Sequence, residues 1–185
     1  MATLRDDLQE ILLSETQINR RLDELAATLQ TDYAGKDLTM VPLLTGSVMF
    51  VADLLRRVPG PLRLDFLGVS SYHGQTSSSG EITLTKPLQL DVRDRDVLVV
   101  DDILDTGLTL VRVQEMLRSL QPRSVKFCVF LEKEIPHHQK FRADYVGFQI
   151  PNKFVVGYGL DYRERYRNLP YVGVLKPEAI EQCPC

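Results

Sequence analysis

The feature of the sequence that most constrains its fold is an apolar stretch that ends in two acidic residues. Residues 97–100 are four consecutive large apolar residues, three of which are β-branched, and Asp101 and Asp102 follow them directly. A short stretch that is apolar on both faces is typical of a strand in a parallel sheet with helices above and below it. The stretch therefore predicts an α/β fold in which it forms the central strand.

A polar loop follows this strand and precedes the next helical pattern. It contains Asp105, Thr106, Gly107 and Thr109. Ligands bind at the carboxyl ends of the strands in open parallel sheets, so this loop lies where a ligand is expected. Glycine allows backbone conformations that a side chain would exclude, and the N–H groups at the start of a helix bind anions with the help of the helix dipole. With two threonine hydroxyls as further donors, the loop predicts a binding site for a phosphate monoester.

Asp101 and Asp102 would repel that phosphate unless another group lay between them. Mg²⁺ is one such group, because it prefers oxygen ligands and keeps several of its waters. A ribose is another, because its hydroxyl groups would donate hydrogen bonds to the same carboxylates. Together these features describe a phosphorylated ribose that is bound with Mg²⁺.

Two motifs resemble a known family. Residues 97–109, VLVVDDILDTGLT, resemble the phosphoribosyl pyrophosphate (PRPP) signature of the type I phosphoribosyltransferases. Residues 154–162, FVVGYGLDY, resemble the purine-binding segment of the branch that acts on hypoxanthine and guanine, and the sequence Leu131-Glu132-Lys133 matches that branch's base-recognising lysine. A plain buried strand with a polar turn and a capped helix would explain neither the paired acids nor the Thr-Gly loop.

The resemblance implies the type I phosphoribosyltransferase fold. Residues 1–185 would form a single domain with a central, mainly parallel sheet flanked by helices. The N-terminal segment and residues 150–185 would form a small hood. A flexible lid loop over residues 70–81, which begins near Ser71 and Tyr72, would close over the site. That segment is polar and rich in small residues, and the alternative is a plain linker. A lid would shield a ribosyl cation from water.

The resemblance also implies an activity, which is transfer of the 5-phosphoribosyl group from PRPP to N9 of hypoxanthine or guanine in purine salvage. The products would be IMP or GMP and pyrophosphate. The implied cofactor is Mg²⁺, with Asp101, Asp102 and Asp161 as the metal-binding residues. The residues implied to bind the ribose and 5′-phosphate are Asp101, Asp102, Asp105, Thr106, Gly107, Leu108 and Thr109. Those implied to bind pyrophosphate are Thr45, Gly46 and Arg167.

The purine site follows from the same resemblance. Phe154 would stack on the base, the backbone of Val155 would meet its polar edge, and Lys133 would donate to the 6-oxo group. Asp105 is the implied catalytic residue, since it would lie near N7 and accept its proton. Human-type relatives carry a lysine where Thr45 stands, and some relatives carry one where Leu108 stands. The cis peptide that relatives often have in the pyrophosphate turn is left open for Leu44–Thr45.

Hydrophobic patterns predict the remaining elements. Ser14 and Gln17 have the spacing of a capping box, and an apolar stripe that ends at Leu29 follows them. Residues 40–44 predict a strand that Pro42 weakens, and residues 48–55 predict a helix. Further strands are expected over residues 64–69, 81–90, 125–131 and 144–148, and a further helix is expected over residues 110–120.

Composition excludes several classes of protein. A net charge of −3 argues against binding to nucleic acid, and no apolar run is long enough to span a membrane. The N-terminus lacks the apolar core of a secretory signal, so a cytoplasmic location is expected. The motifs of dinucleotide-binding dehydrogenases and P-loop kinases are absent. The partners expected are small-molecule substrates and, because relatives form dimers and tetramers, further copies of the chain.

Some alternatives stay open. One is a PRPP-binding regulator of the pyrimidine pathway on the same fold, and another is a transferase for a different base such as xanthine. A non-catalytic binding module is a third. The three cysteines, Cys128, Cys183 and Cys185, are interpreted as non-catalytic.

Overall fold

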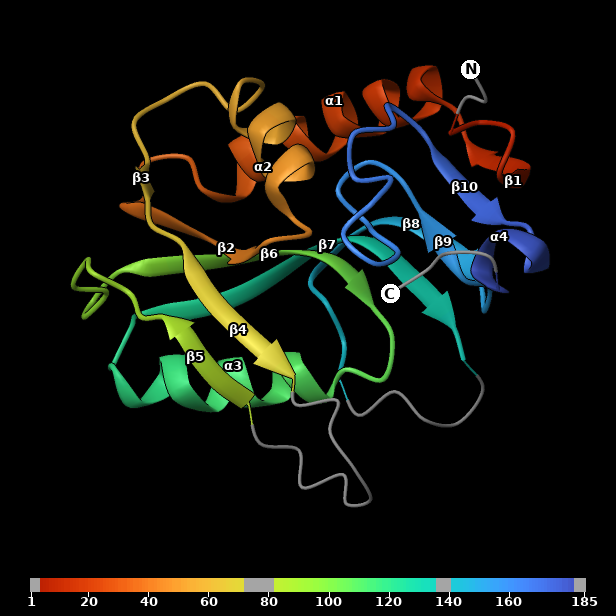
Figure 1. The fold of residues 1–185 in the computed structure, drawn as a ribbon. Helices are drawn as coiled ribbons and strands as arrows, with labels where there is room; N and C mark the ends of the chain where they lie inside the picture. Colours follow the sequence, from red (N-terminus) through yellow and green to blue (C-terminus); the bar gives the residue numbers. More distant parts are fainter. Residues whose placement is uncertain (1–3, 72–81, 136–140, 182–185) are drawn as a thin grey trace.

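The computed structural model of the chain describes residues 4–71, 82–135 and 141–181 (Figure 1). The elements are β1 (Leu8–Leu13), α1 (Glu15–Asp32), β2 (Leu38–Leu44), α2 (Val48–Leu55), β3 (Arg63–Leu64), β4 (Leu67–Ser71), β5 (Ile82–Lys86), β6 (Asp96–Leu104), α3 (Leu108–Ser119), β7 (Ser124–Glu134), β8 (Tyr145–Pro151), β9 (Val155–Val156), β10 (Val172–Leu175) and α4 (Pro177–Glu181).

The larger sheet has the strand order β5-β4-β2-β6-β7-β8, with β3 beside β2. All neighbours in it are parallel except β4 and β5. The predicted central strand is β6, which lies between β2 and β7, and residues 97–100 have no exposed surface. The prediction of an α/β fold with a mainly parallel central sheet is therefore confirmed.

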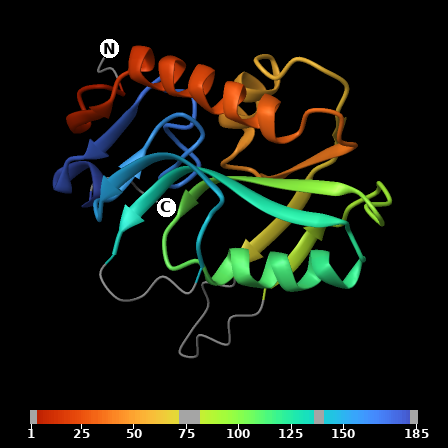
Figure 2. The ribbon, with the colours of Figure 1, turned by 180° about the vertical axis from the view of Figure 1, so that it is seen from behind.

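Helices cover both faces of this sheet (Figures 1 and 2). Leu98 and Val100 pack in one core cluster with residues of α1 and α2. Val97 and Val99 pack in a second cluster with residues of α3 on the opposite face. Successive side chains of a strand point to opposite faces, so the uninterrupted apolar run supplies both cores at once.

A smaller antiparallel sheet, with the order β1-β10-β9, joins the two ends of the chain. In Figure 1, β2, β6 and β7 all run toward this sheet, so their carboxyl ends face it. Helix α1 starts directly after β1, and Ser14 forms the predicted capping box with Gln17. The small sheet therefore lies next to the edge of the large sheet where a ligand is expected.

The strand predicted over residues 64–69 is divided into β3 and β4 at Asp65, a buried residue. Its carboxylate accepts hydrogen bonds from the backbone N–H groups of Phe66, Gln89 and Leu90 and from Lys86 Nζ. The strand predicted over residues 81–90 ends before Pro87. No helix in the described part of the chain is both long and apolar enough to cross a membrane.

Candidate active site

The loop after β6 has the features of an anion site. Gly107 precedes α3 with φ of 78° and ψ of 0°, and a Cβ atom there would lie 2.7 Å from Phe141 Cβ. Only glycine fits both the backbone conformation and the space. No side chain among the described residues caps α3 at Gly107. The first N–H groups of α3 and the positive end of its dipole are therefore oriented for an anionic ligand.

Asp101 and Asp102 lie in the last part of β6 and interact with each other. Burial raises the pKa of Asp101 well above its usual range, and the charge of Asp102 raises it further. Burial also raises the pKa of Asp102, while its hydrogen bond with Asp101 and the nearby positive charge of Arg167 oppose that rise. Two neighbouring carboxylates repel each other when both are charged. A cation or hydrogen-bond donors next to them would offset that repulsion.

The turn after β2 packs directly against this acid pair. The Leu44–Thr45 peptide is cis, Thr45 is exposed, and Gly46 follows. A Cβ atom on Gly46 would lie only 1.7 Å from Asp102 Oδ2. Because β2 and β6 are parallel neighbours, the two loops meet at the same edge of the sheet.

The C-terminal segment reaches the same turn. Gly159 has φ of 102°, and a Cβ atom there would lie 2.0 Å from the carbonyl oxygen of Gly46. The carbonyl of Gly159 accepts a hydrogen bond of 2.8 Å from Arg167 Nη1. The structure therefore brings the predicted pyrophosphate residues Gly46 and Arg167 to one place beside Asp102.

Asp161 pairs with Arg167, at 3.0 Å between Oδ1 and Nη2. Within the described ranges, no three or more His, Cys, Asp or Glu side chains are grouped so that they could hold a metal ion. Asp101, Asp102 and Asp161 therefore do not form a complete metal site by themselves. The carboxylates of Asp101 and Asp102 are still oxygen donors of the kind that Mg²⁺ accepts when substrate oxygens and waters complete its coordination.

An ion pair joins the predicted base-recognising and catalytic residues. Lys133 Nζ lies 3.0 Å from Asp105 Oδ2, with 13% of the lysine side chain exposed and 47% of the aspartate. Glu132 of β7 pairs with Leu104 of β6. The next residues along the two chains, Lys133 and Asp105, therefore lie close enough to pair. The pair offers a proton donor and a proton acceptor side by side at the sheet edge.

Phe154 presents an aromatic ring near this edge. The residue is 48% exposed, and its ring meets Tyr162 edge to face, with centroids 5.6 Å apart. Val155 is buried in β9 and pairs with Val174 of β10. Because about half of Phe154 is exposed, part of its ring surface is available for stacking on a planar ligand.

The remaining predicted residues are placed as follows. Thr106 and Leu108 are exposed, and Thr109 is partly buried in the first turn of α3. Ser71 ends β4. Tyr72 and residues 72–81 of the predicted lid lie outside the described residues. The Tyr158 hydroxyl donates to Asp53 Oδ2 at 2.7 Å. The sequence did not predict this contact, because no local pattern links two residues so far apart in the chain.

Comparisons with known proteins agree with this geometry. Residues 9–163 match the profile of a phosphoribosyl transferase domain. The chain is 48% identical over 175 residues to the hypoxanthine-guanine phosphoribosyltransferase of Staphylococcus aureus strain Mu50. The matched residues cover 95% of this chain and 98% of that protein.

Solved structures give the same result. The crystal structure of a hypoxanthine phosphoribosyltransferase from Staphylococcus aureus superimposes with a TM-score of 0.90 at 48% identity and covers 96% of both chains. A hypoxanthine-guanine-xanthine phosphoribosyltransferase superimposes with a TM-score of 0.85 at 38% identity, covering 92% of this chain and 99% of the other.

Proposed function

The chain belongs to the phosphoribosyl transferase family, and from this membership we propose that it is a purine salvage enzyme that transfers the 5-phosphoribosyl group of PRPP to hypoxanthine or guanine. The products are IMP or GMP and pyrophosphate. The observation that carries the proposal is the meeting of three parts at one sheet edge. These are the acid pair with the start of α3, the Gly46 turn with Arg167, and the Lys133–Asp105 pair.

The 5′-phosphate of PRPP binds at the loop of residues 105–109. Its oxygens accept hydrogen bonds from the first N–H groups of α3 and from the hydroxyls of Thr106 and Thr109. Leu108 supplies no charge, so the amides and the helix dipole provide the attraction. The ribose hydroxyls donate to Asp101 and Asp102, which are partly buried at the adjoining end of β6.

The diphosphate of PRPP binds between the turn of Thr45 and Gly46 and the guanidinium of Arg167. Asp101 and Asp102 would hold Mg²⁺ together with substrate oxygens and waters, and Asp161 would contribute through its own oxygens and bound waters. The metal supplies positive charge that stabilises the leaving pyrophosphate. Asp101 and Asp102 fit this role, since a cation beside them would stabilise the state in which both carboxylates are charged.

The base binds between Phe154 and the Lys133–Asp105 pair. Phe154 stacks on the purine ring, and the backbone of Val155 contacts its polar edge. Lys133 donates to the 6-oxo group and would meet a donor amine if adenine entered, which leaves buried polar groups unpaired and selects against adenine.

Asp105 acts as the catalytic group. N9 of the base attacks C1′, the bond from C1′ to the pyrophosphate oxygen breaks, and Asp105 accepts the N7 proton. Lys133 Nζ lies 3.0 Å from Oδ2 of this carboxylate and can hold it in place beside the base. Closure of the predicted lid at Ser71 and Tyr72 would exclude water from the ribosyl cation.

The test is an initial-rate assay of hypoxanthine, guanine, xanthine and adenine with PRPP and Mg²⁺. We expect nucleotide formation with one or more oxopurines and little with adenine. Xanthine as the best substrate would favour the alternative base specificity. A PRPP-binding regulator would take up PRPP in calorimetry but convert none of the bases, and that result would refute the proposed reaction.

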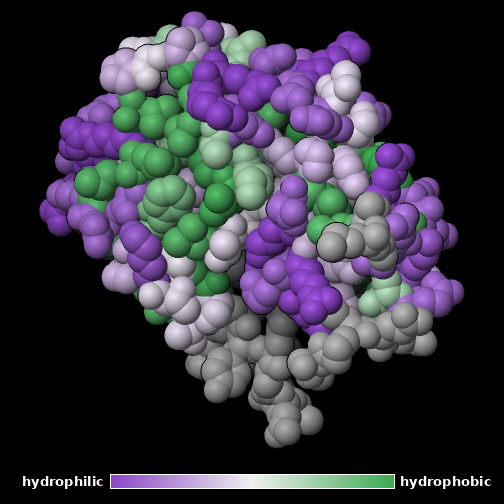
Figure 3. All heavy atoms as spheres, turned by 45° about the horizontal axis from the view of Figure 1, so that its top comes forward, coloured by the Kyte–Doolittle hydropathy of each residue, from purple (hydrophilic) through white to green (hydrophobic). Residues whose placement is uncertain are grey.

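Three further features complete the proposal. Residues 1–185 act as a single domain, in which the small sheet and the rest of residues 150–185 serve as the hood. The enzyme acts in the cytoplasm, because its substrate PRPP is highly charged and does not cross a bilayer unaided. It assembles as a homodimer or homotetramer, in keeping with the apolar side chains that gather in one area of the surface in Figure 3. Light scattering after size-exclusion chromatography measures the number of subunits.

A further inference from the structure

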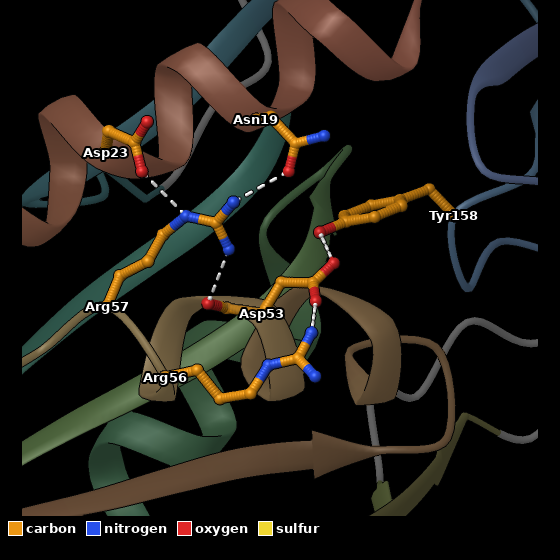
Figure 4. A network of polar contacts seen from close by, with 6 residues as sticks. All are labelled: Asn19, Asp23, Asp53, Arg56, Arg57 and Tyr158. Carbon is orange, nitrogen blue, oxygen red and sulfur yellow. Dashed lines mark hydrogen bonds and ion pairs between the residues drawn. The ribbon is translucent and has the colours of Figure 1, made fainter.

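A polar network ties the C-terminal segment to the two helices above the sheet (Figure 4). Tyr158 lies between Gly157 and Gly159, is 6% exposed, and donates a hydrogen bond of 2.7 Å to Asp53 Oδ2 of α2. The other oxygen of Asp53 pairs with Arg56. Figure 4 shows the tyrosine ring entering from the C-terminal segment and pointing its hydroxyl at the carboxylate.

The network continues from α2 to α1 through Arg57. Arg57 donates to the backbone carbonyl of Asp53 at 2.9 Å, to Asn19 Oδ1 at 2.7 Å and to Asp23 Oδ1 at 2.8 Å. Three elements are therefore joined around Asp53. Burial raises the pKa of Tyr158, and the Asp53 carboxylate raises it further, so the hydroxyl stays protonated as the donor.

The two ends of the Tyr158–Asp53 contact belong to different parts of the active site. Asp53 lies on α2, the helix that begins directly after the pyrophosphate turn. Tyr158 precedes Gly159, which packs on the carbonyl of Gly46 and accepts a hydrogen bond from Arg167. The contact therefore joins α2, the helix that follows the pyrophosphate turn, to the C-terminal segment in which Gly159 binds Arg167.

The Tyr158–Asp53 hydrogen bond lies at a place where the two parts are not fully packed against each other. A cavity of about 350 Å³ lies beside the contact, and its lining includes Met49, Asp53, Tyr158 and Arg167. The tyrosine ring packs on Phe130 of β7, with centroids 4.9 Å apart, while its hydroxyl makes the polar contact to α2 next to the cavity. Where apolar packing is incomplete, a directional hydrogen bond to a charged group has a larger share in fixing the geometry.

We propose that Tyr158 and Asp53 are positioning residues that fix the pyrophosphate turn relative to Arg167 and thereby set the affinity for the diphosphate of PRPP. The inference rests on the proposed function, because it assigns the pair to the same reaction. Neither residue contacts the substrate in this assignment. Both act through Gly46 and Arg167.

The test compares variants that remove or keep one hydrogen bond. Tyr158→Phe removes the donor, and Asp53→Ala removes the acceptor. We expect each to raise KM for PRPP, and for pyrophosphate in the reverse reaction, by about tenfold, with kcat within about twofold of the wild type. Asp53→Asn keeps an oxygen that can accept from the tyrosine and should restore KM to near the wild-type value.

Tyr145→Phe is the matched control. Tyr145 is 7% exposed, and its hydroxyl donates to Asp32 Oδ2 at 2.6 Å, but the residue begins β8 at the opposite edge of the sheet. This variant should lower the melting temperature by an amount similar to Tyr158→Phe while leaving both KM values unchanged. The difference between the two tyrosines separates positioning from general stabilisation.

The outcomes are distinct. If Tyr158→Phe and Tyr145→Phe both lower the melting temperature and neither changes KM, the positioning role is overturned and the proposed function stands. If Asp53→Asn behaves like Asp53→Ala, the hydrogen bond from Tyr158 is not the relevant contact, and the positioning role is again overturned. A wild-type protein that forms no nucleotide from any oxopurine would overturn the proposed function instead.

Discussion

Replacing Lys133 with methionine tests how the base is chosen. Methionine keeps an unbranched apolar chain of similar length, so the packing of the stem is largely retained. It removes the ammonium group that lies 3.0 Å from Asp105 Oδ2 and, in the proposed complex, donates to the 6-oxo group. The variant therefore isolates the loss of one charged donor at the sheet edge.

The expected loss follows from the burial of the two partners. Only 13% of the Lys133 side chain is exposed, so its hydrogen bond to the base is well shielded from water. A hydrogen bond to a charged group contributes about 1.5–3 kcal/mol, which corresponds to a fall of about 10- to 150-fold in kcat/KM for hypoxanthine. Adenine gains nothing from the lysine, so its rate should stay the same or rise, and the preference for hypoxanthine should shrink accordingly.

Folding stability should change little in the same variant. The Asp105 side chain is 47% exposed, and ion pairs with one exposed partner contribute less than about 1 kcal/mol. For a chain of this length that corresponds to a shift of about 2–4 °C or less in the melting temperature. A much larger shift would mean that the loss of activity reflects a damaged fold.

The assay measures initial rates with hypoxanthine and adenine at saturating PRPP and Mg²⁺. Lys126→Met is the matched control, because Lys126 lies on the same strand at the opposite edge and donates to the Tyr145 hydroxyl at 3.1 Å. Its rates should equal those of the wild type. An unchanged hypoxanthine rate in Lys133→Met, or an equal loss with both bases, would refute the reasoning that Lys133 reads the 6-oxo group.

Three further substitutions test other parts of the site and the fold. Asp105→Ala should lower kcat about 100-fold or more while calorimetry shows PRPP affinity near that of the wild type, because the residue acts on the base. Gly46→Ala should abolish detectable PRPP binding in calorimetry, since the added Cβ would lie 1.7 Å from Asp102 Oδ2 and displace the turn. Asp65→Asn should lower the free energy of unfolding by about 2 kcal/mol in urea titrations, because it removes the charge with which buried Asp65 pairs with Lys86 and accepts the backbone hydrogen bonds. Although burial opposes it, these hydrogen bonds lower the pKa of Asp65, so the difference from the wild type should be full above about pH 4 and shrink as the pH falls further.

The sequence predicted those parts of the fold that have a strong local signal. The run at residues 97–100 predicted a central strand because an uninterrupted apolar strand needs cover on both faces. The helix predicted over residues 48–55 has the bounds of α2, Val48–Leu55. Pro42 weakened the prediction of β2, yet the strand continues through it, because the pairing with β3 and β4 skips that position while the pairing with β6 is kept.

Pairings between distant segments could not be predicted in this way. Strand β1 pairs with β10 from the other end of the chain, with Leu8 opposite Leu175. Neither segment is long or regular enough to indicate a strand alone, since each becomes one only through its partner. The division of β3 from β4 has the same origin, because it depends on the buried carboxylate of Asp65 and donors some 24 residues away.

The residues of the site were easier to predict than the contacts between its loops. The acid pair, the Thr-Gly loop and Lys133 carry chemistry that can be recognised in the sequence, and the structure brings them to one edge. The sequence shows that the C-terminal motif contains glycines but not what their backbone approaches. In the structure, Gly159 approaches the carbonyl of Gly46.

That contact changes how substitutions in the C-terminal motif should be understood. Gly46 packs against Asp102 on one side and Gly159 on the other, and neither approach leaves room for a Cβ atom. The turn for pyrophosphate is therefore in direct contact with a carboxylate of the acid pair and with the backbone of the segment that carries Phe154. Because closely packed parts shift together, a change on the purine side at Gly159 would displace the carbonyl of Gly46 and reach the PRPP side without any direct contact with that substrate.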